Sequence, residues 1–93
     1  MIKSFNSKET QKIWDGIRSI KLPNEIQQIA RRKLRMLHNS IDKKDLMIPL
    51  SNRLEKLHGA YQEYYSIRIN DRWRIVFQWE NGHSFKVEII DYH

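Results

Sequence analysis

Residues 64–79 read YYSIRINDRWRIVFQW, and this stretch decides the fold class. Apolar and polar side chains alternate on both sides of Asn70-Asp71-Arg72. This pattern predicts two antiparallel strands that are joined by a three-residue loop and share one apolar face. Keeping that face apolar requires Ile67 to lie opposite Ile75, because a slip of one residue would turn every side chain to the other face.

A third strand is expected after Glu80-Asn81-Gly82, which has a glycine where a three-residue hairpin needs a left-handed residue. This loop would place Phe77 opposite Phe85 and Ile75 opposite Val87. We therefore expect all four of these side chains to be buried against the helices of the domain.

Two helices are expected before the sheet, because apolar residues recur at helical spacing over residues 7–19 and again from Pro23 to about His38. The apolar stripe of the first helix is expected to include Ile17 and Ile20. A helical turn over residues 42–46, a short strand near residues 53–57 and a sheet contact by residues 2–5 complete the expected elements. Together they predict one domain over residues 1–93, an α+β fold in which two N-terminal helices pack on one face of an antiparallel β-sheet.

The composition limits the possible functions. Seventeen Lys and Arg against eleven Asp and Glu give a net charge of +6, which indicates an anionic partner. The absence of cysteine excludes disulfides and thiolate catalysis. No apolar run approaches the roughly 20 residues of a membrane span, and no signal-peptide pattern is present, so we expect a cytoplasmic protein. The four histidines are spread singly and no glycine-rich phosphate loop occurs, so no metal or other cofactor is expected.

The polar face of the predicted sheet suggests an anion site. Arg68 is expected directly opposite Arg74, and like charges in that position are unfavourable unless an anion binds between them. Arginine and tyrosine suit phosphates and stacked bases. An alternative interpretation is a solvated face on which Glu88 lies opposite Arg74 and neutralises it. The residues expected to contact RNA are Tyr64, Arg68, Arg72 and Lys86 on or beside this face, Lys56 in the short strand, and Arg31, Arg32 and Arg35 on the outer face of the second helix.

The C-terminus, Asp91-Tyr92-His93, follows the last strand directly. Cutting RNA without a metal needs a base, an acid and fixed positive charge, and histidine and arginine can supply them. His93 and His58 are the candidate proton carriers; the alternatives are a disordered terminal residue and a turn residue. Arg74 and His93 lie outside the predicted core, so their removal is expected to change stability by less than about 1 kcal/mol.

Several stretches resemble the HigB toxins of type II toxin–antitoxin systems: Arg53-Leu54-Glu55-Lys56-Leu57, the run from Tyr65 to Ile75, and the terminal Asp91-Tyr92-His93. The resemblance covers nearly the whole chain. It implies a RelE-like fold and metal-independent cleavage of messenger RNA in the ribosomal A site. It also implies a HigA-type antitoxin with a helix-turn-helix, through which alone the pair would bind operator DNA.

Carried over by position, the resemblance implies a catalytic set of five residues. Arg74 would stabilise the phosphorane, and His93 and His58 would exchange protons. Asp91 would orient a histidine, and Tyr92 would contact a base or a phosphate. Two other functions remain open: a ParE-like inhibitor of DNA gyrase, which would share the fold but generally lacks the terminal Asp-Tyr-His, and an RNA-binding domain without catalysis.

Overall fold

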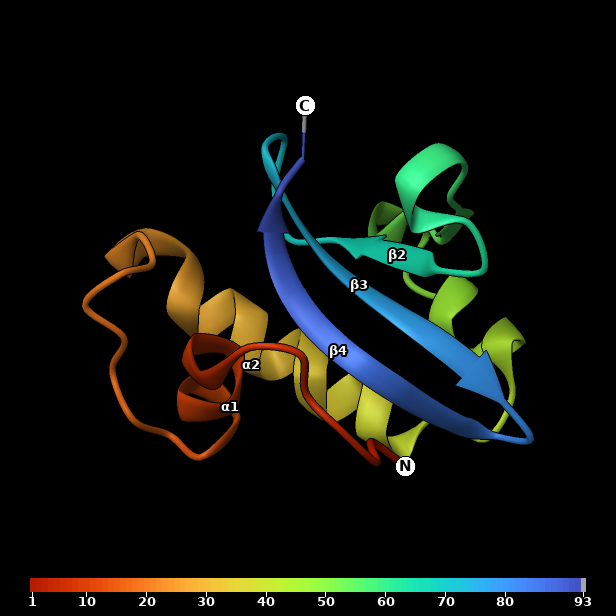
Figure 1. The fold of residues 1–93 in the computed structure, drawn as a ribbon, viewed down its shortest axis with the longest axis horizontal. Helices are drawn as coiled ribbons and strands as arrows, with labels where there is room; N and C mark the ends of the chain where they lie inside the picture. Colours follow the sequence, from red (N-terminus) through yellow and green to blue (C-terminus); the bar gives the residue numbers. More distant parts are fainter. Residues whose placement is uncertain (93) are drawn as a thin grey trace.

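The computed structural model of the protein describes residues 1–92. Over that range it contains one antiparallel sheet of four strands in the order β1-β2-β3-β4. Helices α1 and α2 lie together on one face of this sheet (Figure 1). The predicted α+β fold with two layers is therefore confirmed. The helices span Lys8–Trp14 (α1) and Asn24–Asn39 (α2), and the strands span Glu55–Lys56 (β1), Tyr65–Arg68 (β2), Trp73–Glu80 (β3) and His83–Asp91 (β4).

Three short 3-10 helices and the N-terminal segment complete the chain as described. The 3-10 helices span Lys43–Met47 (η1), Leu50–Asn52 (η2) and Gly59–Tyr61 (η3). The N-terminal segment adds parallel bridges to β4, from Ile2 to Ser84 and from Phe5 to Val87. No helix within residues 1–92 has the length and apolar character that a membrane span requires.

The core lies between α2 and the sheet. Helix α2 buries one apolar stripe, as its periodicity predicts, and exposes the opposite side, which carries Arg31, Arg32 and Arg35. Strands β2, β3 and β4 contribute the other half of the core through the face that the alternation predicts. The fully buried members are Ile26, Ala30, Leu34 and Leu37 from α2, and Ile67, Ile75, Phe77 and Val87 from the sheet.

Helix α1 is shorter than the sequence pattern predicts. It ends at Trp14, and Gly16 follows with a φ of +80°, a left-handed conformation that terminates helices. The Gly16 N–H donates to the carbonyl of Ile13 at 3.1 Å. The prediction that Ile17 and Ile20 belong to an apolar stripe is therefore wrong, since 56% and 96% of these residues is exposed.

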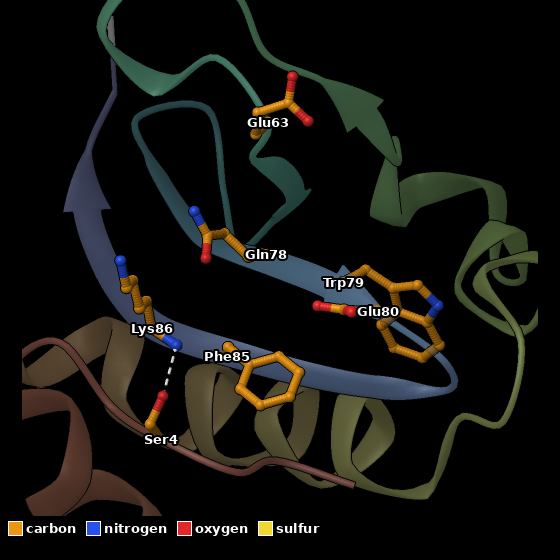
Figure 2. A pocket seen from close by; sticks show the side chains of 7 residues that line it. All are labelled: Ser4, Glu63, Gln78, Trp79, Glu80, Phe85 and Lys86. Carbon is orange, nitrogen blue, oxygen red and sulfur yellow. Dashed lines mark hydrogen bonds between the residues drawn. The ribbon is translucent and has the colours of Figure 1, made fainter.

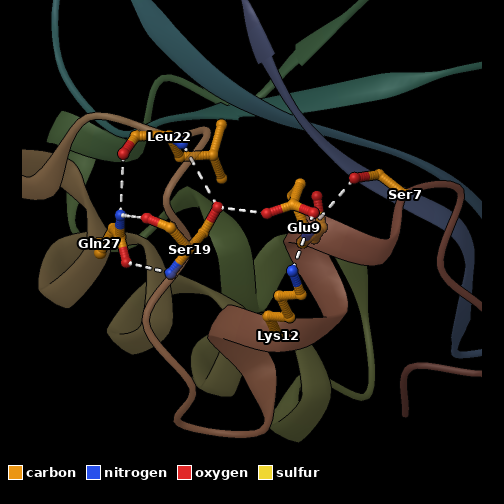
Figure 3. A network of polar contacts seen from close by, with 7 residues as sticks. Ser7, Glu9, Lys12, Ser19, Leu22 and Gln27 are labelled. Atoms are coloured by element: carbon orange, nitrogen blue, oxygen red, sulfur yellow. Dashed lines mark hydrogen bonds and ion pairs between the residues drawn. The ribbon is translucent and has the colours of Figure 1, made fainter.

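A polar network holds the connection between α1 and α2 (Figure 3). The buried Ser19 hydroxyl donates to Glu9 Oε1 at 2.6 Å. Gln27 of α2 accepts from the Ser19 N–H at 3.0 Å and donates to the carbonyls of Ser19 and Leu22 at 2.7 and 2.9 Å. The hydrogen bond from Ser19, with a smaller contribution from Lys12, lowers the pKa of Glu9. One glutamine thus satisfies three backbone groups of an otherwise irregular segment.

We expect Gln27→Ala to lower the free energy of unfolding by about 1–3 kcal/mol, because it leaves these backbone groups without their partner. For a domain of this size that corresponds to a fall in Tm of about 4–8 °C per kcal/mol. Thermal denaturation followed by circular dichroism measures the effect. The control is Gln28→Ala, since the neighbouring Gln28 is exposed on the same helix. An equal Tm for the two variants would show that the hydrogen bonds of Gln27 do not stabilise the connection between α1 and α2.

The predicted pairing of β2 with β3 is confirmed. Ile67 lies opposite Ile75, and Arg68 lies opposite Arg74. The loop between the strands is closed by Asn70, whose side-chain oxygen accepts from the N–H groups of Arg72 and Trp73 at 2.9 and 2.8 Å. An asparagine that caps its own turn in this way is a common hairpin device.

The predicted pairing of β3 with β4 is wrong. The turn consists of Asn81 and Gly82 alone, with φ angles of 51° and 81°, the left-handed pair typical of a two-residue hairpin. A β-bulge then shifts the register, so that Phe77 faces two residues of β4. As a result Phe85 pairs with Gln78 and is only partly buried.

The same bulge changes the neighbours of Arg74. Ile90 lies opposite Arg74, and Glu88 lies opposite Val76. The interpretation in which Glu88 neutralises Arg74 from the facing position is therefore wrong. Val87 remains in the core as predicted, but it lies across from Phe77 rather than Ile75.

Candidate active site

The face of the sheet turned away from α1 and α2 is here called the open face (Figure 1). It carries Arg74, which lies opposite Arg68 and next to the core residue Ile75 on β3. Although Arg74 lies outside the apolar core, as predicted, only 9% of its side chain is exposed. Its Nε donates to Ser66 Oγ at 2.7 Å, and its Nη2 donates to the carbonyl oxygens of Arg53 at 2.5 Å and Ser66 at 3.5 Å. We now expect the removal of Arg74 to lower stability by more than the sequence suggested, because its loss would leave buried acceptors without a donor.

These contacts orient the guanidinium so that one end remains available. Nε and Nη2 are engaged by Ser66 and Arg53, whereas among residues 1–92 Nη1 makes only a loose ion pair, 3.7 Å from Glu55 Oε1. The Tyr92 ring lies on the same group, with its centroid 5.7 Å from the guanidinium carbon. Burial lowers the pKa of Arg74, while Glu55 and Tyr92 oppose this change. The arginine stays charged, and its Nη1 protons can meet an anion.

The chain end that carries Tyr92 is held in place by Arg72. The Arg72 guanidinium donates to both carboxylate oxygens of Asp91 at 2.8–3.0 Å. The hydrogen bond that Arg72 donates to Asp91 raises the pKa of Arg72. The Tyr92 N–H donates to the Arg72 carbonyl at 2.7 Å. Arg72 thus holds the last residues of β4 beside Arg74, while 63% of its side chain remains exposed.

Two other residues expected on this face lie on β2 and just before it. Arg68, opposite Arg74, forms an ion pair with the exposed Asp71. Tyr64 packs edge-on against Tyr61, with ring centroids 5.4 Å apart. Burial, followed by the charge of Glu88, raises the pKa of Tyr64. The structure therefore places Arg68 opposite Arg74, and it places Tyr64 beside Tyr61 at the other end of β2.

The remaining predicted residues are dispersed. Lys56 lies opposite Tyr65 on β2, which places it on the helix side of the sheet. Lys86 lies in the bulge of β4. His58 is exposed just before η3, and within residues 1–92 it has no hydrogen bond, ion pair or ring contact. His93 lies outside the described residues.

The basic side of α2 faces away from the open face. The Arg31 guanidinium lies against Gly16, where an added Cβ would be 3.1 Å from its Nη2. Lys33 turns toward η2 and donates to the Asn52 side-chain oxygen. Burial lowers the pKa of Lys33, and the charges of Arg32 and Arg68 lower it further.

Three contributors to the site were missed from the sequence: Glu55, Ser66 and the carbonyl of Arg53. The two-residue strand β1 brings Glu55 opposite Ser66. A strand this short has no periodicity that could predict its register. Among residues 1–92 no group of three or more His, Cys, Asp or Glu side chains is arranged to hold a metal ion.

Comparison with solved structures places the fold. YafQ from Escherichia coli BL21(DE3) superposes with a TM-score of 0.65 at 10% identity, covering 98% of this chain and 91% of that one. The YoeB dimer from Staphylococcus aureus gives a TM-score of 0.62 at 25% identity, covering 99% and 94%. A YoeB–YefM complex from the same species gives 0.61 at 22% identity, covering 100% and 98%.

Sequence comparison gives the family. Toxin HigB-1 of Vibrio cholerae is 35% identical over 83 residues, which cover 88% of this chain and 87% of that protein. Endoribonuclease HigB of Proteus vulgaris is 31% identical over 97 residues and is matched along the full length of both. The family model described as "RelE-like toxin of type II toxin-antitoxin system HigB" matches residues 3–93. The chain therefore belongs to the HigB family of RelE-like toxins.

Proposed function

We propose that this protein is an endoribonuclease that cleaves messenger RNA in the ribosomal A site. The observation that carries the proposal is the oriented Arg74, whose Nη1 is left to meet a phosphate beside the Tyr92 ring. The relative from Proteus vulgaris, which is named an endoribonuclease, supports it. A DNA gyrase inhibitor would have no need of a buried guanidinium beside the Tyr92 ring.

The proposed reaction is an internal transfer at one phosphate. A base takes the proton of the 2′-hydroxyl, the 2′-oxygen bonds to phosphorus, and the bond from phosphorus to the 5′-oxygen breaks. An acid then protonates that 5′-oxygen, so the products are a 2′,3′-cyclic phosphate and a free 5′-hydroxyl. Charge develops on the phosphoryl oxygens during this exchange, and a preorganised cation stabilises it.

Each candidate residue has a role in this scheme. Arg74 stabilises the charged phosphorane through Nη1. Glu55, half exposed and 3.7 Å from that nitrogen, is placed to accept the 2′-hydroxyl proton. His58 is the alternative base that the family resemblance implies. His93 donates to the leaving oxygen, and Tyr92 stacks on a base. Arg68 and Tyr64 would hold the neighbouring RNA.

The proposed partners follow from the type II family. An antitoxin of the HigA type would neutralise the toxin, and operator DNA would be bound only through the antitoxin. The YoeB–YefM complex, formed by a structural neighbour, supports an antitoxin partner in general. The proposed location is the cytoplasm, where ribosomes and messenger RNA are available.

The test is to incubate the purified protein with ribosomes that carry a defined messenger and to map the 5′-ends of the products. Cleavage within the A-site codon is expected, with no requirement for added metal ions. Inhibition of DNA gyrase without cleavage would favour the ParE-like alternative. Ribosome binding without cleavage would favour a catalytically silent RNA-binding domain.

A further prediction concerns the basic side of α2. Arg32 and Arg35 are exposed, and phosphate contacts by such residues position a protein without reading sequence. The double variant Arg32→Gln/Arg35→Gln should bind ribosomes more weakly and with a shallower dependence on salt, by about one unit of slope for each phosphate that is no longer bound. Sedimentation with ribosomes at several salt concentrations measures this.

The charge-matched control is Lys3→Gln/Lys8→Gln, which removes two exposed cations from the N-terminal segment and α1. Both double variants should melt like the wild type. If the two double variants bind ribosomes equally well, the basic side of α2 is an ordinary solvated surface and does not contact ribosomal phosphates.

A further inference from the structure

The two groups that hold the Arg74 guanidinium lie in parts of the chain that are fixed in different ways. Ser66 belongs to β2, and the pairing of β2 with β3 places it beside Arg74. The far edge of this sheet is tied to the N-terminal segment, where Ser4 Oγ accepts from the Lys86 N–H at 2.9 Å (Figure 2). The Arg53 carbonyl lies outside the sheet, in the irregular segment between η2 and β1. Its position must therefore be set by other contacts.

Asn52 anchors this segment to the core side of the molecule. It is polar and yet fully buried. Its Nδ2 donates to the carbonyl of Leu46 in η1 and to Met36 Sδ in α2, both at 3.1 Å. Its Oδ1 accepts from Lys33 Nζ, also in α2. A buried amide is tolerated only when it is hydrogen-bonded in this way, and here one side chain joins α2, η1 and η2.

The backbone after Asn52 adopts a conformation that is rare for a residue with a side chain. Arg53 is left-handed, with a φ of 45° and a ψ of 59°. Its N–H donates to the Leu50 carbonyl at 3.0 Å, and its own carbonyl accepts from Arg74 Nη2 at 2.5 Å. Such conformations persist only where the surroundings determine them strongly, and they gather at functional sites. The contacts of Asn52 supply that constraint and direct the Arg53 carbonyl toward Arg74.

We propose that Asn52 is a positioning residue for catalysis. It holds the Arg53 carbonyl, which turns the Arg74 guanidinium so that Nη1 is left to meet the phosphate. Asn52 is fully buried, so it acts through Arg74 and does not itself touch RNA. A donor stabilises developing charge best when it is already oriented before the reaction. This role rests on the proposed ribonuclease function and gives α2 and η1 a part in orienting the catalytic arginine.

The orientation of Arg74 can be tested without RNA, by nitrogen-15 NMR of the arginine side chains at low temperature. The signals of Arg74 are identified by their loss in Arg74→Lys. In the wild type, hydrogen bonds to Ser66 and Arg53 should slow rotation of the guanidinium and give separate Nη signals. In Asn52→Ala the Nη signals should broaden or merge, while the Nε–H signal persists because Ser66 remains in place. Unchanged Nη signals in folded Asn52→Ala protein would overturn the proposal.

The effect on catalysis should appear in kcat. Asn52→Ala is expected to lower kcat for ribosome-bound messenger by about 10- to 100-fold, because a misplacement of about 1 Å can cost up to about 100-fold. KM should stay unchanged, since the exposed side chains that contact RNA are retained. Asn52→Asp keeps the size of the side chain and its contact with Lys33 but cannot donate to the Leu46 carbonyl. It should lower kcat in the same way, and it provides the test if Asn52→Ala does not fold.

Gln27→Ala is the matched control. Gln27 is also an amide of α2 that binds backbone groups of a loop, but it holds the connection between α1 and α2. Both alanine variants should melt earlier than the wild type. With rates measured well below the Tm of each variant, Gln27→Ala should keep the wild-type kcat and the Arg74 signals. An equal fall in kcat for Gln27→Ala and Asn52→Ala would reflect a general loss of stability and would overturn the proposal.

Combining Asn52→Ala with Arg74→Lys shows whether Asn52 acts through the arginine. In the Arg74→Lys protein there is no guanidinium to orient, so Asn52→Ala should cause little further loss of cleavage. A loss by the same factor in both backgrounds would assign Asn52 a purely structural role. If the wild type cuts no messenger on the ribosome, the proposed function falls and the catalytic role of Asn52 falls with it. The NMR signals would still decide whether Asn52 orients Arg74.

Discussion

Arg74→Lys is expected to lower cleavage of ribosome-bound messenger RNA about 100- to 1000-fold, the usual cost of losing one preorganised donor to a developing oxyanion. The substitution keeps a positive charge but replaces a planar fork with a single ammonium group. In the native protein Ser66 and the Arg53 carbonyl hold the fork so that Nη1 stays available. A lysine cannot satisfy these acceptors and present a second donor group at the same time.

Arg74→Ala separates this catalytic effect from a structural one. Because the side chain is nine-tenths buried, its removal leaves Ser66 and the Arg53 carbonyl without their donor, at a cost of about 1–3 kcal/mol. Relief of the repulsion from Arg68 offsets a few tenths of a kcal/mol of this. We therefore expect Arg74→Ala to lose activity and also to melt earlier than the wild type.

The measurement is cleavage well below the Tm of each variant, together with thermal melts. Arg18→Lys, at an exposed arginine between α1 and α2, is the control and should resemble the wild type in both. If Arg74→Lys cleaves the messenger at the wild-type rate, the orientation of the guanidinium does not contribute to catalysis. Loss of activity only in step with loss of folded protein would assign Arg74 a purely structural role.

The hairpin between β2 and β3 was predictable because the side-chain alternation and the loop chemistry agree. Ile67 and Ile75 must share the core face, and Asn70 closes the loop that this pairing requires. The next hairpin was not predictable in the same way. Asn81-Gly82 is itself a strong two-residue turn signal. The register that this turn sets changes at a bulge in β4 opposite Phe77. Bulges leave no clear mark on hydrophobic alternation, so this change could not be predicted.

The site was predictable in its chemistry and only partly in its geometry. The facing pair of Arg68 and Arg74 follows from the register. The burial of Arg74 does not, because it depends on the long-range approach of the segment containing Arg53 and Glu55. Exposure of Ile17 was missed for a related reason, since one left-handed glycine ends a helix whose apolar spacing continues past it.

His93→Ala is expected to lower cleavage by about 100- to 10,000-fold, the range for loss of a general acid or base. The residue follows Tyr92, whose ring lies on the Arg74 guanidinium. If His93 protonates the leaving 5′-oxygen, it must carry a proton to work, so the wild-type rate falls on the alkaline side of the pH profile. His93→Ala should lose that alkaline limb and keep the wild-type Tm.

The base of the reaction can be identified by comparing Glu55→Gln with His58→Ala. Glu55 lies 3.7 Å from Arg74 Nη1, whereas His58 is exposed just before η3. We therefore expect Glu55→Gln to cause the larger loss of cleavage, because the amide cannot accept the 2′-hydroxyl proton. The converse result, with His58→Ala the more damaging, would make His58 the base and leave Glu55 as a neighbour of Arg74. Full cleavage by His93→Ala would exclude the C-terminal histidine from proton transfer whatever the base.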